Sequence, residues 1–134
     1  MTIVVDASVM VGDLIDPDRR GVWARSQLTE GLLAAPHLVT VEATRALRRA
    51  RLNQRLSADK ANLAFADLLN LPLALYPLTP FAARIWELRE TVTAYDAWYV
   101  ALAETLGAPL VTLDRRLAKS PGPTCRFETP PSRI

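Results

Sequence analysis

The stretch that decides the fold is Thr2-Ile3-Val4-Val5-Asp6, a β-branched apolar run that ends at an acid. A short run of this kind is typical of a strand buried on both faces, as in a parallel sheet. The pattern returns near the other end of the chain, where Leu110-Val111-Thr112-Leu113 is followed by Asp114. An acid is unfavourable at the end of a central strand unless a site uses it, so Asp6 predicts a functional site.

Between these two stretches, short apolar runs alternate with longer segments of helical periodicity. Further strands are expected at Leu32–Ala34, before Pro36, at Leu73–Tyr76 and at Cys125–Glu128. Helices are expected at about 16–28, at 39–51, after Ser57, after Thr79-Pro80, from Asp96 to Gly107 and at about 114–119. This alternation predicts one domain over residues 1–134, a three-layer α/β/α sandwich with a mostly parallel central sheet.

The composition excludes several classes of protein. With 134 residues, 50% of them hydrophobic and 22% charged, the chain is able to bury a core and is not disordered. A net charge of +2 excludes a uniformly basic coat. One cysteine, Cys125, and one histidine, His37, exclude His/Cys zinc sites, so any metal must have oxygen ligands. No apolar run is long enough to cross a membrane, and a cytoplasmic protein is expected.

Four acids occupy positions from which they are able to meet at one edge of the sheet. Asp6 and Asp114 follow strands, Asp96 begins an apolar helix, and Glu42 lies beside the apolar stripe of helix 39–51. Open α/β sheets bind ligands at the carboxyl ends of their strands. Carboxylates near a core are costly unless they are paired or bind a cation. An oxygen-only set suits Mg²⁺ or Mn²⁺, which promotes phosphodiester hydrolysis.

Each acid also has an ordinary structural interpretation. Asp96 and Asp114 are able to cap the helices that follow them. Glu42 is able to pair with Arg45 or Arg49 on the surface of its own helix. Spacing alone does not decide whether the four acids converge.

The segments around the acids resemble the PIN domain family, and within it the VapC-type toxins of bacterial toxin–antitoxin pairs. The matching segments are Val4-Val5-Asp6-Ala7-Ser8, Val41-Glu42-Ala43, Tyr95–Ala103 and Leu110–Asp114. They follow one another in the family's order and cover nearly the whole chain.

The resemblance implies a metal-dependent endoribonuclease that acts as a toxin, cleaves structured RNA such as tRNA or rRNA, and is inhibited by a cognate antitoxin. By resemblance Asp6, Asp96 and Asp114 hold Mg²⁺ or Mn²⁺, Glu42 completes the set, and Ser8 and Thr112 orient carboxylates. Some relatives carry another acid soon after the last one. Arginines follow Asp114 here, so one resident ion is expected, with another arriving with the RNA.

The basic residues are almost all arginines, which suit bidentate contacts with phosphate. Arg45, Arg49, Arg115 and Arg116 are candidate RNA-binding residues, and a solvated helix face is the alternative. The three tryptophans, Trp23, Trp86 and Trp98, are expected in the core. The resemblance also implies a homodimer, and the apolar helices at 61–69 and 81–88 are candidates for the dimer and antitoxin surfaces.

Other folds with an early aspartate fit less well. A haloacid-dehalogenase-type phosphatase needs a second aspartate where this chain has Ser8, and a receiver domain needs an acidic pair. Phosphate-binding turns need clustered glycines, and the five glycines are scattered. Two alternatives stay open: a catalytically idle PIN fold that serves as a binding or regulatory module, and a housekeeping RNA-processing nuclease without an antitoxin.

Overall fold

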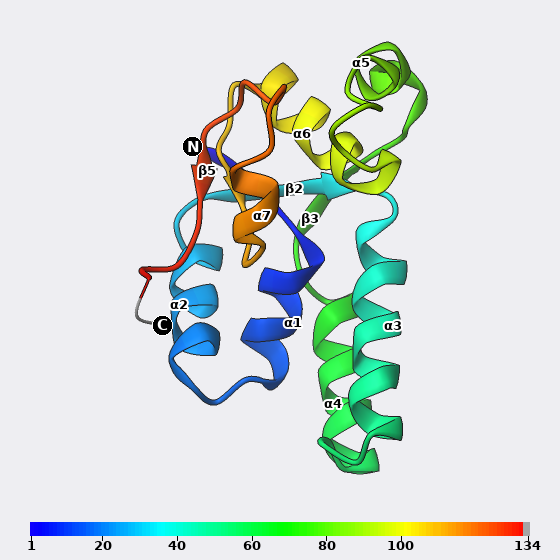
Figure 1. The fold of residues 1–134 in the computed structure, drawn as a ribbon. Helices are drawn as coiled ribbons and strands as arrows, with labels where there is room; N and C mark the ends of the chain where they lie inside the picture. The colour runs from blue at the N-terminus through cyan, green and yellow to red at the C-terminus, as the bar shows by residue number, and fades with distance from the viewer. Residues whose placement is uncertain (133–134) are drawn as a thin grey trace.

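The computed structural model describes residues 1–132, which form one five-stranded parallel sheet with helices on both faces (Figure 1). The strands are β1 (Thr2–Val5), β2 (Leu32–Pro36), β3 (Leu73–Tyr76), β4 (Leu110–Val111) and β5 (Phe127–Glu128). Their order in the sheet is β3-β2-β1-β4-β5, and every neighbouring pair is parallel. The predicted three-layer sandwich is therefore confirmed.

The helices divide between the two faces of the sheet. They are α1 (Ala7–Ile15), α2 (Arg19–Leu28), α3 (Val39–Leu52), α4 (Ala58–Leu69), the 3-10 turn η1 (Thr79–Phe81), α5 (Ala82–Glu87), α6 (Ala94–Leu106) and α7 (Arg115–Ala118). In Figure 1, α5 and α6 lie on one side of the sheet and α1 to α4 on the other. Within residues 1–132, no helix is long and apolar enough to cross a membrane.

The core is built around β1 and α6. Val4 and Val5 are fully buried because β1 is the central strand and both of its faces are covered. Small residues on α6, such as Ala97 and Ala101, are equally buried and let the helix approach β1, β2 and β4 closely. Each fully buried Val or Leu side chain contributes roughly 1.5–3 kcal/mol, so these central positions fix where the strand ends lie.

The helix predicted at about 16–28 is α2, but it begins at Arg19, and a further helix that was not predicted, α1, precedes it at Ala7–Ile15. Asp16 is the C-cap of α1, and α2 begins only at Arg19. The carboxylate of Asp16 accepts a hydrogen bond from the backbone N–H of Asp18 at 2.8 Å, which shapes the turn between the helices. The β-branched residues of α1 disfavour a helix locally, but packing of α1 against α2 and α3 outweighs that preference.

Other helix ends follow the expected capping chemistry. Ser57 caps α4 through a hydrogen bond from the N–H of Lys60 at 3.2 Å, as predicted. Gly107 ends α6 with a left-handed backbone, φ 61°, which glycine adopts without strain. Thr93, and not Asp96, caps the start of α6, since its hydroxyl accepts the N–H of Asp96 at 3.2 Å. Asp96 therefore lies inside the first turn of the helix.

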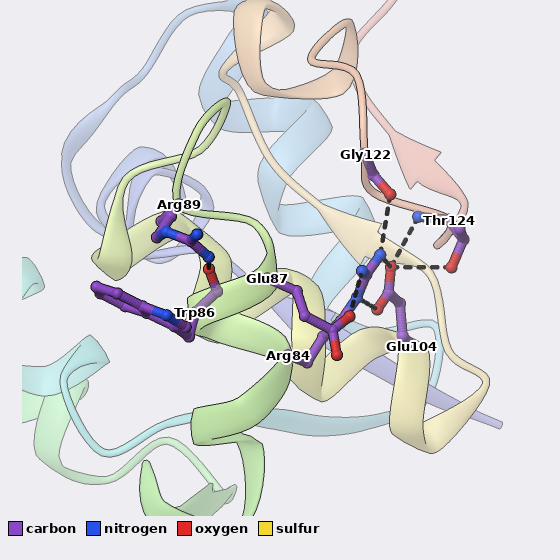
Figure 2. Close-up of polar contacts among 7 residues, drawn as sticks. All are labelled: Arg84, Trp86, Glu87, Arg89, Glu104, Gly122 and Thr124. Atoms are coloured by element: carbon purple, nitrogen blue, oxygen red, sulfur yellow. Dashed lines mark hydrogen bonds and ion pairs between the residues drawn. The ribbon is translucent and has the colours of Figure 1, made fainter.

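Arg84 and Trp86, both on α5, have different surroundings: Arg84 is paired within the chain and Trp86 is exposed (Figure 2). The Arg84 guanidinium makes a bidentate pair with Glu104 of α6, at 2.8 and 3.1 Å, and also donates to the carbonyl of Gly122. Trp86, in contrast, is 67% exposed, so its expected place in the core was wrong. The guanidinium of Arg89 lies 4.6 Å from the centre of its ring. Trp23 and Trp98 pack against the core, as expected.

Candidate active site

Asp6 follows β1 directly and is held by two hydroxyl groups. Its Oδ2 accepts hydrogen bonds from Thr112 Oγ1 at 2.6 Å and from Ser8 Oγ at 3.1 Å. Thr112 follows β4, the neighbour of β1, and is fully buried. The parallel pairing of β1 and β4 thus brings together residues that are 106 positions apart.

Backbone groups orient these two hydroxyls. Ser8 Oγ accepts the N–H of Leu113 at 3.2 Å, and Thr112 Oγ1 accepts the N–H of Asp114 at 3.0 Å. Each hydroxyl has one hydrogen to donate, and both hydrogens go to Asp6. The predicted contacts of Ser8 and Thr112 with a carboxylate are therefore present, and they fix the orientation of Asp6.

Glu42 reaches the same region from the first turn of α3, which begins just after the end of β2. Its Oε1 accepts a hydrogen bond of 2.6 Å from the phenol of Tyr99, which is only 1% exposed. Burial raises the pKa of Glu42, and the charges of Asp6 and Asp96 raise it further, against the Tyr99 hydrogen bond and the Arg45 charge. Glu42 is thus part of an acidic cluster and not a plain surface partner of Arg45.

Asp96 lies in the first turn of α6 and is half-buried. Its pKa is raised by burial first and then by the charges of Asp6 and Asp114, while the Thr93 hydroxyl and Arg116 lower it. The charges of the four acids therefore act on one another. Four elements, β1, α3, α6 and the end of β4, bring these acids to one edge of the sheet, although they are far apart in sequence.

Asp114 caps α7 and is also a member of this cluster. Its Oδ1 accepts the N–H groups of Arg116 at 2.9 Å and Leu117 at 3.2 Å. The capping role considered from the sequence is therefore present. It uses only Oδ1, and the charge of Asp114 still raises the pKa of Asp96.

The donor chemistry of the cluster suits a hard divalent cation, because every candidate ligand is a carboxylate oxygen. Within residues 1–132, no group of three or more His, Cys, Asp or Glu side chains has the geometry to hold an ion. Two of the four carboxylates already use an oxygen within the chain: Glu42 accepts a hydrogen bond from Tyr99, and Asp114 accepts one from the N-terminus of α7.

The tyrosine that holds Glu42 was not among the residues singled out from the sequence. Tyr99 is three positions after Asp96, so both side chains lie on the same side of α6. That spacing was the available signal, but the partner on α3 is 57 positions away and only the folded chain reveals it.

Two arginines act electrostatically on the cluster from different elements. The charge of Arg45 acts on Glu42 from α3, and that of Arg116 acts on Asp96 from α7. Arg49 lines a groove of about 530 Å³ that Ser8 and Leu113 also line. Arg115 differs, since it donates to the carbonyls of Pro130 and Pro131, at 2.8 Å each. The guanidinium of Arg115 is thus occupied with the C-terminal segment.

The family follows from comparison with known proteins. The sequence model of the PIN domain matches residues 3–122, and the chain belongs to this family. It is of the VapC type: it is 41% identical over 126 residues to Ribonuclease VapC1 of Mycobacterium tuberculosis. That alignment covers 93% of this chain and 95% of the relative.

Solved structures share the fold at lower sequence identity. VapC20 of Mycobacterium tuberculosis, described as a sarcin–ricin loop cleaving toxin, matches with a TM-score of 0.65 and 18% identity. The match covers 87% of this chain and 92% of VapC20. A toxin–antitoxin complex from Klebsiella pneumoniae matches with a TM-score of 0.63 and 20% identity, over 96% of this chain and 98% of that one.

Proposed function

We propose that this protein is a metal-dependent endoribonuclease that hydrolyses phosphodiester bonds in structured RNA and serves as the toxin of a toxin–antitoxin pair. The observation that carries the proposal is the cluster of four acids at the carboxyl ends of β1 and β4. Burial and mutual repulsion raise the pKa values of Glu42 and Asp96, so a divalent cation would relieve an unfavourable arrangement. The VapC-type relatives carry the name ribonuclease.

In this proposal Asp6, Glu42, Asp96 and Asp114 hold Mg²⁺ or Mn²⁺, which when bound polarises the scissile phosphate and provides hydroxide near neutral pH. Ser8 and Thr112 keep Asp6 in one orientation through their hydroxyls. Asp114 contributes one oxygen, because its other oxygen caps α7. Removal of a group that orients a metal-binding carboxylate, as Ser8 and Thr112 orient Asp6, typically lowers metal affinity or activity by about 10–100-fold.

Arginines around the acids supply the complementary charge for an RNA backbone. Arg45 and Arg116 flank the cluster, and Arg49 lines the adjacent groove. Arginine makes bidentate contacts with phosphate, and each neutralised phosphate makes binding more dependent on salt. We assign RNA contacts to these three residues, and Arg115 stays a weaker candidate because the C-terminal segment occupies it.

The partners proposed are a cognate antitoxin and a second copy of this chain. The fold is shared with a toxin from Mycobacterium tuberculosis and with a toxin–antitoxin complex from Klebsiella pneumoniae. An antitoxin segment that covers the acidic cluster would keep RNA away from it. We propose that the protein acts in the cytoplasm, where its RNA substrate is found. For the dimer, the exposed apolar side chains of Leu63 and Leu69 on α4 and Trp86 on α5 are candidates.

The activity is tested with purified protein and total RNA, with and without Mg²⁺ or Mn²⁺. Wild type is expected to cut discrete sites only with metal, and Asp6→Ala is expected to lose cleavage. Asp59→Asn is the matched control, because Asp59 is an exposed acid in the first turn of α4. Equal cleavage by wild type and Asp6→Ala, or none with either metal, would exclude the proposed enzyme and favour an idle binding module.

The partners are tested separately. Light scattering should give twice the monomer mass for wild type, and Leu63→Lys or Trp86→Lys should reduce it if the corresponding surface is used. A small antitoxin-like reading frame is expected just upstream, and co-expression with its product should abolish cleavage by the copurified complex. Cleavage without such a neighbour would favour the housekeeping nuclease.

A further inference from the structure

The buried hydroxyl of Tyr99 contacts an acid from another helix and has no place in the proposed chemistry so far. Tyr99 donates to Glu42 Oε1 at 2.6 Å, and its side chain is 1% exposed. It projects from α6 one turn after Asp96, so one helix carries both an acid and the donor that holds another acid.

Glu42 needs such a donor more than Asp6 and Asp114 do. Asp6 is held by two hydroxyls and Asp114 by two backbone N–H groups. Glu42 has a longer side chain with more rotatable bonds, and fixing it costs more conformational entropy. Its hydrogen bond to Tyr99 is the one side-chain hydrogen bond that it makes within residues 1–132.

The charges of the neighbouring acids oppose the placement of a charged Glu42 in the cluster. Asp6 and Asp96 repel it, while Arg45, one turn along α3 and exposed, attracts it toward solvent. An exposed pair of this spacing is weak, and a hydrogen bond to a charged group in a water-poor environment is stronger. The phenol is therefore the contact that opposes movement of Glu42 toward solvent.

We propose that Tyr99 is a positioning residue whose hydroxyl holds Glu42 inside the acidic cluster, so that a divalent cation meets four carboxylates instead of three. The inference rests on the proposed function, because it assigns Tyr99 a task in the same metal site. A purely structural tyrosine needs only some acceptor for its buried hydroxyl. Here the acceptor is a member of the cluster, and this is the contact that the proposal explains.

Tyr99→Phe removes the hydroxyl and keeps the ring, so it tests the contact without opening a cavity. Mn²⁺ alone is titrated into RNA-free protein, and free Mn²⁺ is followed by electron paramagnetic resonance. The dissociation constant is expected to rise roughly 10–100-fold in Tyr99→Phe. Tyr95→Phe is the matched control on the same helix, since Tyr95 is 62% exposed, and it should bind Mn²⁺ as wild type does.

A double-mutant cycle separates action through Glu42 from a general effect on the fold. In a Glu42→Ala background, Tyr99→Phe should weaken Mn²⁺ binding no further. Equal Mn²⁺ binding by wild type and Tyr99→Phe overturns the inference, and so does a full further loss in the Glu42→Ala background. Absence of Mn²⁺ binding by wild type overturns the proposed function itself, and the inference with it.

A second measurement needs no change at Tyr99. The chain has three tyrosines, Tyr76, Tyr95 and Tyr99, and their ¹³Cζ signals are assigned with Tyr76→Phe and Tyr95→Phe. Added Mg²⁺ should shift the Tyr99 signal in wild type, and the shift should vanish in Glu42→Ala. If the ¹³Cζ signal of Tyr99 does not shift with Mg²⁺ although the protein binds Mn²⁺ normally, the proposed role of Tyr99 is contradicted.

Discussion

Helix α6 carries a carboxylate toward each end, and the pKa values of these two carboxylates are shifted in opposite directions. At its N-terminal end, burial and the charges of Asp6 and Asp114 raise the pKa of Asp96. Toward its C-terminal end, burial alone would raise the pKa of Glu104, but hydrogen bonds from Arg84 and Thr124 outweigh it and lower that pKa. Thr124 donates to Glu104 through both its backbone N–H, at 2.7 Å, and its hydroxyl, at 2.9 Å (Figure 2).

Glu104 is thus an acid that stabilises the fold, whereas Asp96 is an acid for which we propose a role in chemistry. Glu104 has its donors and its counter-charge within the chain, and it ties α6 to α5 and to the segment before β5. Asp96 has acids as neighbours, and burial and their charges outweigh the charge of Arg116, so a bound cation would relieve the repulsion.

Asp96→Asn should reduce RNA cleavage roughly 100-fold or more, because a metal ligand contributes several kcal/mol and each ~1.4 kcal/mol is tenfold in rate. Its melting temperature should not fall, since the substitution removes repulsion from the cluster. Cleavage rates and thermal unfolding of the same preparation check both points. A fall in melting temperature with unchanged cleavage would contradict the proposal, since Asp96 would then stabilise the fold and have no role in cleavage.

Glu104→Gln should show the opposite behaviour. It removes the charge from a bidentate pair whose glutamate side chain is 15% exposed, and we expect a loss of about 2 kcal/mol in the free energy of unfolding, reduced because Arg84 is about a third exposed. The melting temperature should fall by roughly 5–10 °C. Cleavage well below that temperature should match wild type, and a large loss of cleavage there would assign Glu104 to the site.

The stabilisation by Glu104 should depend on pH. Its pKa is lower in the folded chain than the ordinary value of 4.5, so its stabilisation is fully present above pH 4.5. That stabilisation is lost as the pH falls through the lowered pKa. The difference in melting temperature between wild type and Glu104→Gln should be large at pH 7 and shrink in acid. A difference that grows in acid would contradict the pairing.

Thr112→Val should reduce cleavage about tenfold, because Asp6 loses its shorter hydroxyl contact and Asp114 N–H loses its acceptor. Thr112→Ser keeps the hydroxyl and should retain most of the activity. Steady-state cleavage of one RNA substrate by the two variants is the measurement. Equal losses in both variants would show that the methyl group and its packing matter, and not the hydroxyl.

The adjacent arginines of α7 should differ, although the effect is small. Arg116→Ala should raise KM a few-fold and reduce the salt slope of RNA binding by about one, as loss of one phosphate contact does. Arg115→Ala should mainly lower the melting temperature, because Arg115 holds the carbonyls of Pro130 and Pro131. Salt titrations of RNA binding by both variants distinguish these roles, and identical slopes would remove Arg116 from the interface.

Much of the fold could be predicted because its strongest signals are local. The β-branched run of β1, the cap at Ser57 and the helix end at Gly107 each depend on residues close in sequence. Helix α1 was missed for the converse reason: its local preference opposes a helix, and contacts with α2 and α3 decide its structure. Trp86 was misplaced because an apolar residue in a short helix does not reveal which side is covered.

By itself the sequence determined which chemistry was available: carboxylates after predicted strands, hydroxyls beside them, arginines nearby, and no His/Cys set for zinc. Only the tertiary structure decided which of these groups meet. The pairing of β1 with β4 joins Thr112 to Asp6, and the fold brings the first turn of α3 within hydrogen-bond distance of α6, which joins Tyr99 to Glu42. Hydrogen bonds act over about 3 Å, and distances of that size between remote residues are set by the packing of the core.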